Sequence, residues 1–142
     1  FHLIQFPEKG RVLIADRNFK IGEIVFEEKA LIIWDSDITL TSNPYKMFLE
    51  LKIDERDQIL NEFYYPGDNA EALNKAEKFI DDLIENKTLE LPQSQNENKN
   101  MLIKFECIMQ INGHTITDER NGLFRTGSKL THSCTPNISY EL

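Results

Sequence analysis

The chain has 142 residues, of which 40% are hydrophobic, so it is long enough for one domain with a buried core. Its 16 basic and 24 acidic residues leave a formal net charge of −8, which argues against a nucleic-acid surface because phosphate contacts need clustered Lys and Arg. No apolar run approaches the roughly 20 residues of a membrane span, and the first residues lack a signal-peptide pattern. The charge favours a basic partner, although an acidic surface that maintains solubility is the commoner explanation.

The first 42 residues are predicted to form short strands. Residues 12–15 and 24–34 are rich in Val, Ile, Leu and Phe, and Gly10 and Gly22 interrupt them. Residues 20–23 are predicted to form a turn between two strands.

The middle of the chain is predicted to be helical. Asn43 is a candidate cap with Pro44 at the first helical position. Asp54 is expected to cap a second helix, and Asp68 or Asn69 a third. In the third helix, apolar residues recur at steps of three and four: Leu73, Ala76, Phe79, Ile80, Leu83 and Ile84. Such a stripe is more often core packing than a groove for a partner.

Residues 92–100 are polar and are predicted to form a flexible loop. A fourth helix is expected over residues 101–111, and Gly113 should end it. One side of this helix carries Leu102, Phe105, Ile108 and Met109. Beyond it, Asn121 and Gly122 signal a turn, and residues 138–142 begin another strand.

The densest cluster of unusual residues lies near the C-terminus, in His132-Ser133-Cys134-Thr135-Pro136-Asn137. This string resembles the signature of SET-domain protein lysine methyltransferases. Two earlier segments resemble their opening Lys-Gly-x-Gly stretch (residues 9–13) and the strand pair that follows it (residues 19–28). Residues 104–124 are similar to the segment that precedes the signature in the SET-and-MYND subfamily. The order and rough spacing agree along the whole chain.

The resemblance implies an α+β fold, a β-rich SET fold of short strands with a helical insert. Residues 1–42 would supply the N-terminal strands, residues 43–111 the insert, and residues 112–142 the C-terminal part of the core. The subfamily's zinc-binding MYND module has no counterpart here, because its cysteines are absent. Only Cys107 and Cys134 are present, without zinc-finger spacing, so we expect no metal site, no disulfide framework and a reducing compartment.

The same resemblance implies a protein lysine N-methyltransferase that uses S-adenosylmethionine. Its substrate would be a histone tail or another basic protein in the nucleus or cytoplasm, without direct contact with nucleic acid or a membrane. Methyl transfer requires alignment of a neutral lysine amine with the sulfonium methyl group and removal of water from both. Carried over position by position, the expected cofactor-binding residues are Gly10, Arg11, Asn112, Ser128, Leu130, Thr131 and His132.

The family pattern assigns no catalytic role to His132 or Cys134. The histidine is expected to be buried and to contact adenine through its backbone, and the cysteine to be a small buried thiol. A hydrolase with a Cys/His pair is therefore a poor alternative, since no base in the motif activates the thiol.

Two residues depart from the family pattern. Val12 replaces the second Gly of Lys-Gly-x-Gly, where its side chain is expected to crowd the cofactor. Thr131 replaces an Asn that contacts the cofactor, and the loss of one such buried hydrogen bond costs about 1–3 kcal/mol. These departures favour the alternative of a degenerate SET module that binds a partner without catalysis. An all-helical adaptor built on residues 43–111 is weaker, because both flanks are predicted to be β.

In the family, a Gly-Glu-Glu stretch and the catalytic Tyr lie downstream of the position matching residue 142. Tyr140 is too close to His132 to be that Tyr. We therefore expect no catalytic residue and no methyltransferase activity in the isolated chain. Methylation of any peptide by this polypeptide alone would contradict that expectation.

Overall fold

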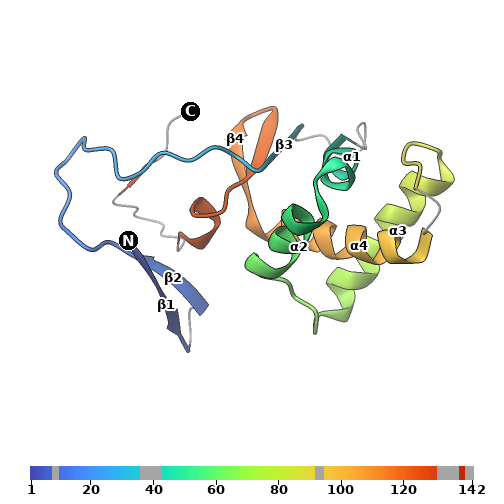
Figure 1. Ribbon diagram of the computed structural model, residues 1–142, viewed down its shortest axis with the longest axis horizontal. Helices are drawn as coiled ribbons and strands as arrows, with labels where there is room; N and C mark the ends of the chain where they lie inside the picture. Colours follow the sequence, from blue (N-terminus) through green and yellow to red (C-terminus); the bar gives the residue numbers. More distant parts are fainter. Residues whose placement is uncertain (8–9, 36–42, 92–94, 131–137, 140–142) are drawn as a thin grey trace.

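The computed structural model describes residues 1–7, 10–35, 43–91, 95–130 and 138–139 (Figure 1). Within these residues, four helices and two small antiparallel sheets form an α+β fold, the class that the sequence predicts. A two-stranded hairpin lies toward one end of the long axis and the helices toward the other, with the second sheet between them (Figure 1).

The hairpin pairs β1 (His2–Phe6) with β2 (Gly10–Ile14), in a register that places Phe6 opposite Gly10. β2 begins two residues before the predicted strand. Gly10 has a φ of +69°, a conformation that L side chains rarely adopt, which explains why glycine stands at this turn. All five residues of β1 are exposed. A hairpin of this size is at best marginally stable alone, so its contacts with the rest of the chain hold it in place.

The segment after β2 only partly follows the prediction. The expected turn at residues 20–23 is confirmed, since the Glu23 amide donates to the Lys20 carbonyl at 3.0 Å and Gly22 has a φ of +80°. The strand predicted over residues 24–34 is wrong for most of its length, because only β3 (Ile32–Asp35) forms. Val, Ile and Phe favour a half-buried pleated surface, but their propensity alone does not supply a neighbouring strand.

The second sheet has the order β3-β5-β4, with β5 (Arg120–Leu123) between β3 and β4 (Gly113–Thr117). The turn expected at Asn121 and Gly122 is wrong, because both residues lie inside β5. A Cβ atom at Gly122 would stand 2.7 Å from Ile116 Cδ1. Glycine here permits a close approach within the sheet and does not mark a turn.

The helices are α1 (Asn43–Glu50), α2 (Ile53–Glu62), α3 (Ala70–Glu85) and α4 (Gln95–Asn112). The predicted cap at Asn69 is confirmed, since its side chain accepts from the Ala72 amide at 3.1 Å. Asp54 is not a cap: α2 begins at Ile53, so Asp54 lies in its first turn and Lys52 precedes the helix. α1 includes Asn43, one residue earlier than expected.

The flexible loop predicted for residues 92–100 is wrong from residue 95 onward, because α4 begins at Gln95; residues 92–94 lie outside the described part. Lys99 explains part of the difference. Its ammonium pairs with Asp81 at 2.8 Å and Glu77 at 3.3 Å, both on α3. A polar stretch that composition marks as flexible thus gains helical order from contacts with a neighbouring helix.

The core lies where α4 packs against the other helices and β3. The apolar side predicted for the fourth helix is buried in full: Leu102, Phe105, Ile108 and Met109 are 0–2% exposed. Phe105 stacks on Phe48 of α1 with ring centroids 4.2 Å apart. From α3, Ala76, Ile80 and Leu83 are buried and Phe79 and Ile84 pack against the same core, so most of the predicted stripe is core packing.

α4 ends at Asn112, one residue beyond the predicted end, and β4 begins at Gly113 without a loop. A Cβ atom at Gly113 would stand 2.6 Å from the Met109 carbonyl oxygen and 2.9 Å from Trp34. Only glycine fits at this junction, where the chain turns from helix into sheet. The junction also holds Asn112 beside the cavity described next.

Candidate functional site

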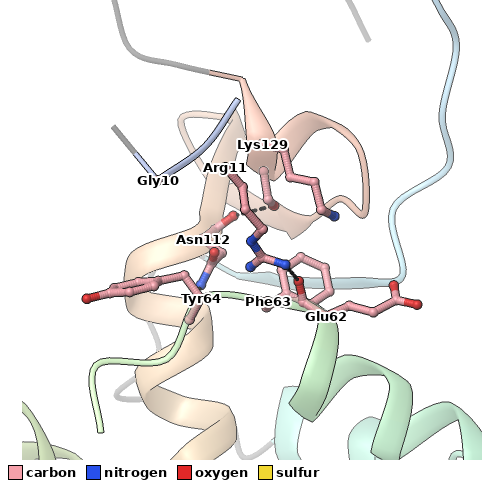
Figure 2. Close-up of a pocket in the computed structure, with 8 residues that line it drawn as sticks. Gly10, Arg11, Glu62, Phe63, Tyr64, Asn112 and Lys129 are labelled. Carbon is pink, nitrogen blue, oxygen red and sulfur yellow. Dashed lines mark hydrogen bonds between the residues drawn. The ribbon is translucent and has the colours of Figure 1, made fainter. Parts of the chain in front are cut away.

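A cavity of about 320 Å³ lies where four separate parts of the chain meet (Figure 2). They are the start of β2, the end of α2 with the residues after it, the end of α4, and the 3₁₀ helix η2 (Gly127–Lys129). The lining residues are Gly10, Arg11, Glu62, Phe63, Tyr64, Asn112, Ser128 and Lys129. The volume is at the lower end of the range typical of small-molecule sites.

Four of the seven expected cofactor-binding residues stand in this wall: Gly10, Arg11, Asn112 and Ser128. Leu130 follows η2 and is not among the lining residues; its amide donates to the Gly127 carbonyl at 3.0 Å. The remaining two, Thr131 and His132, lie outside the described residues.

Arg11 reaches from β2 across the cavity (Figure 2), and its Nη1 donates to the Glu62 carbonyl at 2.5 Å. This bond ties the hairpin to the end of α2. Val12 follows on the same strand and is not among the lining residues. Because side chains alternate along a strand, Val12 points to the face opposite Arg11. The expectation that Val12 crowds the cavity therefore finds no support in this geometry.

Asn112 is 7% exposed and holds two parts of the wall together. Its Nδ2 donates to the Tyr64 and Ile108 carbonyls, each at 2.9 Å. The main-chain carbonyl of Asn112 accepts a hydrogen bond from Ser128 Oγ at 2.8 Å. Both amide protons are thus committed, and the side chain can offer a ligand only its Oδ1 as an acceptor.

Positive charge gathers at the cavity although the whole chain is acidic. Lys129 lies with its ammonium 5.3 Å from the Phe63 ring centroid and donates to the Arg125 carbonyl. Burial lowers the pKa of Lys129, and the charge of Arg11 lowers it further. The Arg125 guanidinium pairs with Glu62 at 2.9 Å. Two cationic groups, Arg11 and Lys129, therefore line the cavity beside one carboxylate that already has a partner.

Sequence reasoning missed half of the described wall: Glu62, Phe63, Tyr64 and Lys129. The first three follow one another where α2 ends, and the adjacent Tyr65-Pro66-Gly67 marks that end in the sequence. Aromatic residues directly after a helix end are one signal for the wall of a cavity. Nothing in the sequence, however, indicates that the end of α2 meets β2.

Within the described ranges, no group of three or more His, Cys, Asp or Glu side chains is placed to hold a metal ion. Cys107 is buried in α4, and burial raises the pKa of its thiol; Cys134 lies outside the described residues. None of the helices in the described part of the chain has the length and hydropathy to cross a membrane.

Comparison of the chain with protein-family models, with curated protein sequences and with solved structures finds no match.

Proposed function

We propose that this chain is the SET-type part of a protein lysine N-methyltransferase, and that the cavity between β2, α2, α4 and η2 binds S-adenosylmethionine. One observation carries the proposal. The family resemblance implies that Gly10, Arg11, Asn112 and Ser128 bind the cofactor, and these four positions, spread over more than a hundred residues, line one cavity.

The chemistry of the cavity supports this ligand. S-adenosylmethionine carries a carboxylate at its methionine end, and Arg11 and Lys129 supply positive charge. The bond from Arg11 to Glu62 engages one of the five N–H donors of a guanidinium, so others can reach a carboxylate. The rings of Phe63 and Tyr64 offer aromatic surface to an adenine.

A basic protein or peptide, such as a histone tail, is the proposed substrate. The outer face of α2 adjoins the cavity at Glu62. The residues of this face carry carboxylates or side-chain amides: Asp54, Glu55, Asp57, Gln58, Asn61 and Glu62. This charge complements lysine-rich segments, which are common on proteins of the nucleus and cytoplasm.

Calorimetric titration of the chain with S-adenosylmethionine tests the cofactor proposal. We expect the wild type to bind and Arg11→Met to bind at least about tenfold more weakly, because a hydrogen bond to a charged group contributes about 1.5–3 kcal/mol. Arg17→Met is the matched control. It removes the same charge from a side chain that pairs with Glu23 at 2.6 Å, away from the cavity wall.

The alternative is a degenerate SET module that binds a partner without using the cofactor. It is favoured by the hydrogen bonds that already engage Arg11 and Lys129 with main-chain carbonyls. Absence of binding at millimolar S-adenosylmethionine, together with binding of a lysine-rich peptide, would reject the cofactor proposal and support this module.

A further inference from the structure

Glu28 joins two distant parts of the chain. It lies in the segment between β2 and β3 that forms no strand. Its Oε1 accepts from the Thr126 amide at 2.8 Å, and its Oε2 accepts from the Thr126 and Gly127 amides at 3.0 and 2.9 Å. The two amides are 98 and 99 residues away in sequence. One carboxylate thus holds two consecutive main-chain N–H groups.

These two amides stand at the start of η2, the helix that supplies Ser128 and Lys129 to the cavity wall. The first amides of a helix have no partner inside it, and the side chain of Thr126 makes no capping hydrogen bond. A three-residue 3₁₀ helix has little stability of its own. The place of η2 therefore depends on contacts from outside, and the bonds from Glu28 are charge-assisted and strong.

Glu28 also acts on the cavity through its charge. Its negative charge supports the protonated form of Lys129 against the burial that lowers the pKa of that ammonium. On the other side of η2, Ser128 is bonded to the Asn112 carbonyl at 2.8 Å. The wall is thus held from α4 at one point and from Glu28 at another.

We propose that Glu28 is a positioning residue for the cavity: by holding the Thr126 and Gly127 amides, it sets where Ser128 and Lys129 stand in the wall. The geometric part of this inference is independent of the ligand. Its effect on cofactor affinity rests on the proposed function.

The test replaces Glu28 by Gln, which keeps the size of the side chain but removes its charge and one acceptor oxygen. Glu27→Gln is the matched control, since it makes the same change at an exposed neighbouring position. Two readouts are compared below the thermal transition of every variant: backbone amide NMR signals without ligand, and the dissociation constant for S-adenosylmethionine.

In Glu28→Gln we expect the Thr126 and Gly127 amide signals to shift, the Ser128, Lys129 and Asn112 signals to shift with them, and the cofactor to bind about three- to tenfold more weakly. Glu27→Gln should leave all of these unchanged. Unshifted Ser128 and Lys129 signals in Glu28→Gln would overturn the positioning role. If the wild type binds S-adenosylmethionine, an equal dissociation constant in Glu28→Gln would overturn it as well. If the wild type binds no S-adenosylmethionine, the proposed function is rejected. Shifted Ser128, Lys129 and Asn112 signals in Glu28→Gln would then still support the positioning role.

Discussion

The hairpin and the helical part of this protein are stabilised in opposite ways. Tyr45, Phe48 and Phe105 of the helices are fully buried, whereas Leu3 and Phe6 of β1 remain 45% and 40% exposed. The helices share one core around α4, while the hairpin is joined to the rest through contacts such as the Arg11–Glu62 bond. Stability should therefore reside in the helices, and the cavity lies at the border between the two regions.

This division implies that the two regions tolerate change differently. Border residues outside the core, such as Arg11, can be altered without removing a core side chain, so affinity for the proposed cofactor and stability can be measured separately.

The largest effect is expected from a pair of Phe→Ala substitutions, one in each region. Phe105→Ala should lower the free energy of unfolding by about 3–5 kcal/mol, because it leaves a cavity beside Phe48 and Tyr45. Phe6→Ala in β1 should cost less than about 1 kcal/mol, since its ring is already partly in water. Urea denaturation measures both. Equal losses in the two variants would show that the hairpin shares the main core.

A smaller effect is expected from a buried carboxyl group in α4. Glu106 is 2% exposed and accepts hydrogen bonds from Tyr45 Oη and Gln110 Nε2, each at 2.5 Å. Burial raises the pKa of Glu106 above its ordinary value of 4.5, although both hydrogen bonds favour the carboxylate. The folded state therefore holds this proton more tightly than the unfolded chain does.

The sign of the pH dependence follows from linkage. The raised pKa of Glu106 contributes to the free energy of unfolding in full below pH 4.5, the ordinary glutamate value. This contribution is lost as the pH rises through the higher pKa of the folded state. Glu106→Gln should remove this loss, so its free energy of unfolding should rise relative to that of the wild type between acid and neutral pH. We expect this relative rise to be comparable to one buried hydrogen bond, about 1–3 kcal/mol. Glu85→Gln, which makes the same change at an exposed position of α3, is the matched control.

The smallest effect is expected at Lys129, at the border. Because the pKa of Lys129 is lowered, this ammonium should lose its proton at a lower pH than an exposed lysine does. Affinity for S-adenosylmethionine should then fall as the pH rises, since the ligand carboxylate loses a cationic partner. Lys129→Met should bind about three- to tenfold more weakly at neutral pH and lose this part of the pH dependence.

The affinities of the wild type and Lys129→Met are compared at each pH. Because titration of the ligand itself affects both equally, it cancels in this comparison. Parallel pH profiles for the wild type and Lys129→Met would show that the ammonium does not take part in binding.

Local pattern predicted the helices well. The cap at Asn69, the buried side of α4 and most of the α3 stripe follow from spacing and side-chain chemistry, which act within a few residues. The failures have a different origin. Residues 95–100 are helical partly because Lys99 meets α3, and Gly122 lies in a strand because β5 has neighbours on both sides.

Local sequence patterns predicted the helical middle, and the family resemblance implied the α+β class and four of the residues that line the cavity. Long-range packing brings these four together, adds Glu62, Phe63, Tyr64 and Lys129 to the wall, and leaves Val12 out of it. Helix periodicity and capping are local, so they can be read along the chain. A cavity is made by segments that are distant in sequence, as are the Arg11–Glu62 and Glu28–Thr126 bonds, and no spacing within one segment encodes such pairs.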